Sequence, residues 1–321
     1  MKFLEDKTQK LRKKLEQALV DVYRKIGKAQ LESVEVLENI ILKLGAVDRR
    51  VIFVLIGLAV LIPLLTPISL PVRETPTTVK FYDGIEDIPK NSKVLVSFDY
   101  GPSTRPEIHP MNVGVLRHML RNGHQIYISC LWPDGIYMAL DALEEITDEV
   151  NPDNESTFDI KEYEDYILLG YRPGAEAVIK GLASDLRKVY TVDANGNFID
   201  DIEMMDGIKN LNDFAYIYSG SAGYPGTFEW VKYGGDPTGV PMSSGTTSVQ
   251  VNEVIPYVQT GQLIGLLAGM PGAAEYEKLI NVPGIAIQGM AAQSFAHIVI
   301  VLFIVFGNLA FFIKQRRDRK Y

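Results

Sequence analysis

Two long uncharged stretches dominate the pattern of hydrophobic and polar residues. Residues 51–72 contain no charged side chain and are flanked by arginine on both sides. The second stretch, residues 279–313, is strongly apolar from position 297 onward. Crossing about 30 Å of hydrocarbon takes about 20 apolar residues in a helix, whereas runs of about 10–14 are typical of buried core helices. We therefore expect two transmembrane helices, at residues 49–72 and 291–313.

The chain before the first apolar stretch has the pattern of one long amphipathic helix, residues 1–48. Neither proline nor a cluster of turn residues occurs between positions 4 and 44, and apolar residues recur in two groups, at steps of three or four within each. This spacing is typical of a helix with one apolar face. The residues that we expect to form an assembly surface on this face are Leu11, Leu15, Val22, Ile26, Leu37 and Ile41.

Three environments are consistent with this helix. Its basic cluster, Lys10 and Arg12 to Lys14, suits an amphipathic helix that lies on the anionic inner leaflet of the lipid bilayer. Acidic residues are nevertheless mixed along the helix, and the apolar face continues for about ten turns. We favour association with a second copy of the chain or with another membrane subunit, and the third alternative is a solvated helix without a partner.

Charge is distributed unevenly along the chain. The first 50 residues hold 12 Lys and Arg against 8 Asp and Glu, and the tail, residues 314–321, holds five basic residues and one acid. Because the whole chain has a net charge of −8, the residues between these two ends carry −16. Basic segments next to membrane helices stay preferentially in the cytoplasm. We expect a two-pass protein of the cell membrane, with both termini cytoplasmic and residues 73–290 outside.

Between the two apolar stretches, short apolar segments alternate with amphipathic ones. Segments with the composition of buried strands are residues 93–99, 124–131, 166–171, 214–219, 242–249 and 263–267. Segments with a helical pattern are residues 110–122, 134–147 and 175–188. Such alternation is typical of a parallel sheet covered by helices on both faces. The expected fold class is α/β, with a doubly wound, mainly parallel, Rossmann-like sheet in an extracytoplasmic domain.

Polar residues follow several of these strands. In an open parallel sheet, ligands bind beyond the carboxyl ends of the strands. Small hydroxyl residues and glycines at these ends let backbone amides approach an anion, and an arginine can pair with it. The candidate ligand-binding rim consists of Asp99, Arg105, Arg172, Ser219, Ser221, Ser244 and Thr246. The alternative is that these residues only turn the strands into helices.

The sequence lacks the motifs of several classes of enzyme and ligand-binding protein. The chain has no P-loop pattern, no G-x-S-x-G and no G-x-G-x-x-G after the first strand. With one cysteine and four histidines, we expect neither a metal site nor a cofactor. The acidic middle of the chain argues against nucleic-acid binding. Cys130, with His109 or His124 as its base, is a candidate nucleophile, but a lone strand cysteine is more often a small core residue.

Two classes of function remain. We favour a non-catalytic structural or assembly subunit of a membrane complex. Such a subunit contacts the lipid bilayer and associates with further copies of the chain or with other membrane subunits. The alternative is a membrane-anchored, hydrolase-like enzyme or a small-ligand receptor that uses the rim. The low-charge segment 261–292 is rich in Gly and Ala, which favours close packing and the first class. Asn308, inside the second apolar stretch, is expected to form a hydrogen bond with another helix.

Overall fold

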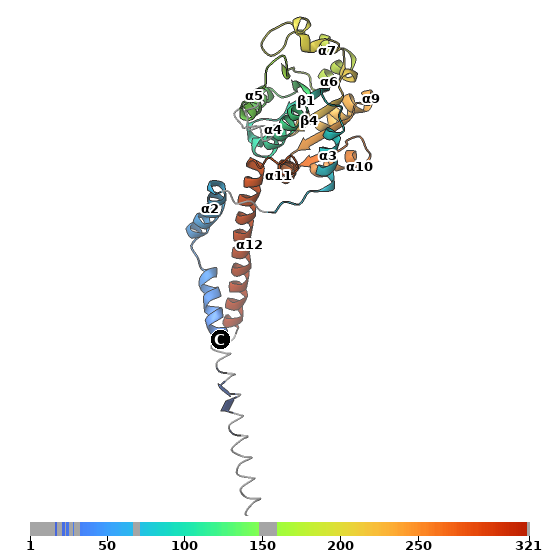
Figure 1. Ribbon diagram of the computed structural model, residues 1–321. Helices are drawn as coiled ribbons and strands as arrows, with labels where there is room; N and C mark the ends of the chain where they lie inside the picture. Colours follow the sequence, from blue (N-terminus) through green and yellow to red (C-terminus); the bar gives the residue numbers. More distant parts are fainter. Residues whose placement is uncertain are drawn as a thin grey trace, which may run out of the picture. The chain divides into compact units, whose positions relative to one another are not determined.

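The computed structural model describes residues 33–66, 71–147 and 159–319, together with isolated positions between residues 17 and 28 (Figure 1). These residues belong to two compact units. The first is residues 66–291, called the α/β unit below. The second combines the two ends of the chain, residues 1–65 and 292–321, and is called the terminal unit.

The α/β unit contains one six-stranded sheet in the order β3-β2-β1-β4-β5-β6 (Figure 1). The strands are β1 (Lys93–Asp99), β2 (Gln125–Cys130), β3 (Tyr166–Tyr171), β4 (Tyr216–Ser221), β5 (Met242–Thr246) and β6 (Leu266–Ala268). Every pair of neighbouring strands is parallel. The predicted α/β fold with a parallel sheet is confirmed, and the sheet is wholly rather than mainly parallel.

The ends of several strands differ from the predicted ones. β4 begins at Tyr216 instead of residue 214 and continues to Ser221, and β5 ends at Thr246 instead of residue 249. Ser221 pairs with Asp99 on one side and with Thr246 on the other. The ladder partners, which local composition does not reveal, therefore decide where these strands end.

Helices connect the strands, as the alternating pattern indicates. The longer helices of the α/β unit are α3 (Pro76–Glu86), α4 (Arg105–Arg121), α5 (Gly135–Thr147), α6 (Glu176–Ser184), α10 (Val251–Gln259) and α11 (Gly269–Leu279). The short helical turns are η1 (Pro102–Thr104), α7 (Leu186–Val189), η2 (Ile199–Asp201), η3 (Glu203–Met205), η4 (Leu211–Asp213), α8 (Thr227–Trp230), the π-helical η5 (Val231–Gly235) and α9 (Asp236–Thr238).

Two predicted helices have different bounds in the structure. α4 begins at Arg105, five residues before the expected position 110, because Pro106 is accommodated in its first turn. The expected helix at residues 175–188 is divided at Asp185, whose extended backbone ends α6 and whose side chain caps α7. A carboxylate that accepts a backbone N–H in this way starts a new helix.

Each face of the sheet has its own hydrophobic core, because successive side chains of a strand point to opposite faces. Val94, Val96 and Phe98 of β1 belong to one core, together with residues of α3, α4, α5 and α11. Leu95 of the same strand belongs to the other core, together with residues of α6, α7, α8 and α10. Both faces of the sheet are therefore covered by helices.

The terminal unit contains most of α12 (Ile285–Asp318), which begins before the expected position 291. Within the described residues, only α12 is long and apolar enough to cross a membrane, by length and composition. α2 (Arg49–Leu65) has 17 residues and ends just before Pro67. A proline disfavours the helical conformation of the residue that precedes it, so the helix does not extend to residue 72 as expected. The first membrane span therefore stays a prediction.

A second helix packs against α12 within the terminal unit. Residues 33–45 are helical, and a Cβ atom added at Gly45 would lie 2.2 Å from Cβ of Ala310. Arg317 Nη2 donates to Glu38 Oε2 at 3.2 Å and to Asn39 Oδ1 at 3.1 Å. Small residues thus allow close contact at one level, and polar contacts add to it at another.

Two sequence expectations concern side chains of the terminal unit. Asn308 Nδ2 donates to the Ile304 carbonyl of its own helix at 2.9 Å, and its expected bond to another helix stays a prediction. Among the predicted assembly residues, Val22 and Leu37 are exposed and Ile41 is half-buried. Leu11, Leu15 and Ile26 lie outside the described residues, and the assembly role of all six stays a prediction.

Candidate functional site

The strand order reverses between β1 and β4, and at such a switch point an open parallel sheet binds ligands. Five of the seven predicted rim residues come together there. Asp99 is paired with Ser221, Ser219 with Ser244, and Ser221 with Thr246. All five side chains are fully buried. The structure therefore places them inside the fold rather than on an open rim.

Asp99 accepts three hydrogen bonds at the end of β1. Its Oδ1 accepts from the Leu131 backbone N–H at 2.8 Å. Its Oδ2 accepts from Ser97 Oγ at 2.7 Å and from Trp230 Nε1 at 2.9 Å. Burial raises the pKa of Asp99 to about 7, although the three hydrogen bonds oppose this shift. The carboxyl group joins β1, the loop after β2 and α8, and solvent does not reach it.

The hydroxyl groups at the switch point bond mainly to one another. Ser221 Oγ accepts from the backbone N–H and the hydroxyl of Thr227, at 3.2 and 3.3 Å. The Thr227 hydroxyl also bonds to Ser244 Oγ at 2.6 Å, and Ser244 Oγ donates to the Ser219 carbonyl at 3.0 Å. Ser219 Oγ and Thr246 Oγ1 are buried without a hydrogen-bond partner among the described residues. Most of the hydroxyl groups are thus used to hold α8 on the sheet.

Two side chains of α4 make hydrogen bonds at the same end of the strands, on the sheet face opposite α8. Glu107 Oε2 accepts from the backbone N–H and the hydroxyl of Ser248, both at 2.8 Å. Asn112 Oδ1 accepts from the Tyr218 hydroxyl at 2.7 Å. A Cβ atom added at Gly220 would lie 2.2 Å from that same oxygen. The glycine at the end of β4 therefore makes room for Asn112.

The two arginines of the predicted rim lie apart from the buried residues. Arg172 donates to the carbonyl oxygens of Tyr171, Val189 and Val192, and its guanidinium lies over the ring of Tyr190. Arg105 is about half-exposed and pairs with Asp141 at 3.6 Å. Each arginine thus has a local structural role, and none of the contacts found for them reaches the five residues at the switch point.

Cys130 is fully buried, and burial raises the pKa of its thiol well above the usual range. Neither histidine proposed as its base contacts it. His109 Nδ1 bonds to the Tyr100 hydroxyl, and His124 Nδ1 accepts from the Ser92 backbone N–H. Reactive cysteines are at least partly exposed and have a lowered pKa. Cys130 is therefore a core residue.

Each of the two buried histidines of α4 is hydrogen-bonded to a tyrosine and a glutamate, an arrangement that has no signal in the sequence. His109 bonds to the Tyr100 hydroxyl at 2.8 Å and to Glu145 Oε2 at 3.3 Å. His118 makes the same pair of contacts with Tyr276 and Glu86. The partners of each histidine lie on other elements, so no spacing along the chain reveals them. Both histidine side chains are buried.

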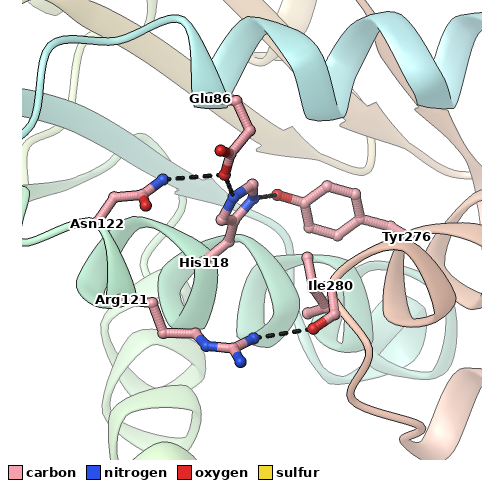
Figure 2. Close-up of polar contacts among 6 residues, drawn as sticks. All are labelled: Glu86, His118, Arg121, Asn122, Tyr276 and Ile280. Atoms are coloured by element: carbon pink, nitrogen blue, oxygen red, sulfur yellow. Dashed lines mark hydrogen bonds and ion pairs between the residues drawn. The ribbon is translucent and has the colours of Figure 1, made fainter. Parts of the chain in front are cut away.

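Figure 2 shows the hydrogen-bonded chain of Glu86, His118 and Tyr276, in which His118 joins three helices. Nε2 of His118 lies 2.5 Å from Glu86 Oε1 of α3, and Nδ1 lies 2.7 Å from the Tyr276 hydroxyl of α11. A carboxylate only accepts hydrogen bonds, so Nε2–H donates to Glu86. In the neutral ring, Nδ1 then accepts from the Tyr276 hydroxyl. Tyr276 and His118 are buried, whereas the side chain of Glu86 is about half-exposed.

The segments that lead into and out of the α/β unit are bonded to each other beside this chain. Thr75, just before α3, donates through its backbone N–H and its hydroxyl to Glu275 Oε2, at 2.9 and 2.7 Å. Lys278 Nζ donates to the Val72 carbonyl and pairs with Glu74, both at 2.7 Å. We call the group formed by Thr75, Glu86, His118, Glu275, Tyr276 and Lys278 the linker joint.

Three hollows in the described part of the α/β unit have linings that include none of the five residues at the switch point. The largest of the three, about 660 Å³, is lined by residues 162–164, 196–198 and 201–203. One of about 380 Å³ lies at the opposite edge of the sheet, where Ala215, Pro241 and Ile264 precede β4, β5 and β6. A smaller one of about 120 Å³ lies between α4 and the start of α12. In the part of the chain that the structure describes, no three histidine, cysteine or acidic side chains lie close enough together to hold a metal ion.

Comparison with known proteins gives no relative for this chain. No family model, no curated protein and no solved structure matches it.

Proposed function

We propose that this chain is a non-catalytic, membrane-anchored subunit that helps to assemble or hold together a membrane protein complex. In this proposal both termini are cytoplasmic, α2 and α12 anchor the chain, and the α/β unit is extracytoplasmic. The support for this orientation is the charge distribution, with +4 at each end and −16 between them.

The observation that carries the proposal is the closed switch point. An enzyme or receptor with this strand order needs an open crevice at the carboxyl ends of β1 and β4. Here Asp99 and Ser221 are fully buried and bonded within the chain, and Glu107 and Asn112 fill the other side. The polar residues at this edge therefore stabilise the fold.

The linker joint supports a role as an anchored module. Thr75 and Glu275 are separated by 200 positions and yet share two hydrogen bonds. A domain whose incoming and outgoing segments are bonded to each other is suited to attachment at both ends. The partners proposed for such a module are the lipid bilayer, a second copy of the chain and other membrane subunits.

The N-terminal helix is the proposed assembly element. Burying each large apolar side chain contributes about 1.5–3 kcal/mol, so a stripe of six such residues in water is unfavourable without a partner. Replacing Leu15, Val22 and Ile26 together with serine is expected to reduce the mass of the particle obtained by gentle detergent extraction. Light scattering coupled to size exclusion measures this mass for the full chain.

The control replaces Gln17, Arg24 and Lys28 with serine. These residues lie two positions after the three apolar ones, on the opposite side of a helix, and all three are exposed. The control is expected to keep the particle mass of the original chain. An unchanged mass in the apolar variant, or a monomer before any substitution, would refute assembly through this helix.

One observation favours the second class, a small-ligand receptor. Ser219 Oγ and Thr246 Oγ1 are buried and lack a partner within the described residues, and buried polar groups are normally hydrogen-bonded. A small polar ligand that reaches the face of the paired strands β4 and β5 would satisfy both. Ligand-induced stabilisation of the purified chain against heat, lost in a Thr246→Val variant, would support this class over the first.

A further inference from the structure

His118 lies in the linker joint, and ionisable groups surround it. On α3, Glu86 bonds to Nε2 and the ring of Tyr82 stacks on the imidazole with centroids 4.9 Å apart. On α11, the Tyr276 hydroxyl bonds to Nδ1. The other charged or titratable groups that act on this histidine are Arg121 of α4 and His124 just before β2. Of these groups, only Glu86 has a negative charge near neutral pH.

Protonation of His118 changes the hydrogen bonding of the joint. The neutral ring accepts the Tyr276 hydroxyl proton at Nδ1 and donates from Nε2. A protonated ring donates from both nitrogens. Nε2–H keeps its bond to Glu86, and the Tyr276 oxygen accepts from Nδ1–H, so the hydroxyl proton of Tyr276 has to turn away from the ring. Tyr276 is fully buried, and a buried hydroxyl proton without an acceptor is unfavourable.

We propose that the linker joint is a pH-sensitive clamp: protonation of His118 at mildly acidic pH leaves the hydroxyl proton of Tyr276 without an acceptor, and so loosens α11, together with the segment before α3 that is bonded to α11, from α4. The device stands on the bonds from His118 to Glu86 and Tyr276, which join the three helices (Figure 2). It is independent of the proposed assembly role.

The pKa of His118 sets the direction of the effect. Burial lowers this pKa, against the influence of Glu86. His118 therefore binds fewer protons in the closed joint than in the open one, and it stabilises the joint at higher pH. The contribution of His118 is complete above about pH 6.5, the ordinary histidine pKa, and is lost as the pH falls below it.

Hydrogen exchange of the full chain in nanodiscs, measured by mass spectrometry between pH 7.5 and 5.5, tests the clamp. After correction for the intrinsic rate, exchange in α11 is expected to rise below pH 6.5, by up to about tenfold per pH unit for one proton. β1 and β4 serve as internal references. Replacing His118 with glutamine, a neutral donor to Glu86, is expected to abolish the rise.

The matched control is His109→Gln, because His109 has the same kinds of partner but lies outside the linker joint. This control is expected to keep the response of α11. A pH response that persists in H118Q, or its absence from the original chain, would overturn the proposal. Should H118Q lose the protection of β1 and β4, Glu86→Gln decides the matter. Removing that negative charge shifts the response to lower pH, and an unmoved midpoint is equally contrary to the clamp.

Discussion

Asp99 shows how a polar residue at a ligand-binding position becomes part of the fold. Its two oxygens accept from Leu131, Ser97 and Trp230, and together these bonds join segments from three parts of the chain. Hydrogen bonds to a buried charged group contribute about 1.5–3 kcal/mol each, whereas the cost of burying the charge opposes them. The balance between the two terms depends on pH.

The substitution Asp99→Asn is expected to flatten the pH dependence of stability. Burial raises the pKa of Asp99 from 3.8 to about 7, so the folded protein holds a proton that the unfolded chain releases. The contribution of Asp99 to the free energy of unfolding therefore falls as the pH rises from about 4 to about 7, by roughly 2–4 kcal/mol. Thermal unfolding of both proteins at several pH values measures this difference.

In the variant the amide does not titrate, so its stability deficit relative to the original chain should shrink between pH 5 and pH 8. The amide still offers one acceptor oxygen, but its NH₂ group faces a donor. A deficit that stays constant over this range would contradict a raised pKa of Asp99 in the folded protein.

The sequence identified the polar residues at the switch point but not their state. Asp99 and Ser221 follow apolar strands, and the rule that parallel strands end at one edge is enough to bring them together. Their burial depends on Trp230, which lies 131 positions after Asp99. Asn112 and Glu107 cover the other face from within α4. No local pattern encodes such distant pairings, so an open rim and a closed one look alike in the sequence.

At the scale of elements, one carboxylate of α11 caps the start of α12 within the α/β unit. Glu277 is buried, and its two oxygens accept from the backbone N–H groups of Gly284, Ala286 and Ile287, at 3.0, 2.9 and 2.9 Å. The first N–H groups of a helix have no partner within it, and a negative charge is favourable at that end. Glu277 therefore sets the position at which α12 begins.

Glu277→Ala is expected to weaken the first turn of α12. Loss of hydrogen bonds to a charged group costs about 1.5–3 kcal/mol, and Glu277→Gln, which keeps one acceptor, should cost less. Hydrogen exchange of the amides of residues 284–287 measures the change. Glu144, an exposed glutamate of α5, provides the control as Glu144→Ala. Equal protection of α12 in Glu277→Ala and the control would show that the cap has no such role.

The strands and the ends of α12 and α2 show what the hydrophobic pattern alone predicts and what it does not. Short apolar runs gave the strands and their parallel arrangement, because alternation with helices leaves few other folds. The sequence predicts a transmembrane helix that begins at residue 291, but α12 begins at Ile285, where Glu277 supplies the cap. The uncharged stretch predicts a first helix that continues to residue 72, but α2 ends at Leu65, just before Pro67. Composition locates apolar segments, whereas caps and prolines set their ends.

For the whole molecule, the decisive question is how many times the chain crosses the membrane. Within the described residues, α12 alone has the length and composition of a full span, and α2 has 17 residues. At about 1.5 Å per residue, α2 covers about 26 Å, slightly less than the typical hydrocarbon thickness of about 30 Å. A thinner bilayer or flanking side chains that reach the interface accommodate such a difference at modest cost. Two crossings put both termini on one side, and one crossing puts them on opposite sides.

Single introduced cysteines distinguish these arrangements, since Cys130 is fully buried and contributes little labelling. With two spans, an impermeant thiol reagent is expected to label Asn154→Cys in intact cells, whereas Gln17→Cys and Gln315→Cys react only after lysis. The physical reason is the net charge of +4 at each end, which keeps the basic segments in the cytoplasm. Labelling of both Gln17→Cys and Asn154→Cys in intact cells would leave α12 as the single span. Labelling of Gln17→Cys and Gln315→Cys but not Asn154→Cys would reverse the orientation and place the α/β unit in the cytoplasm.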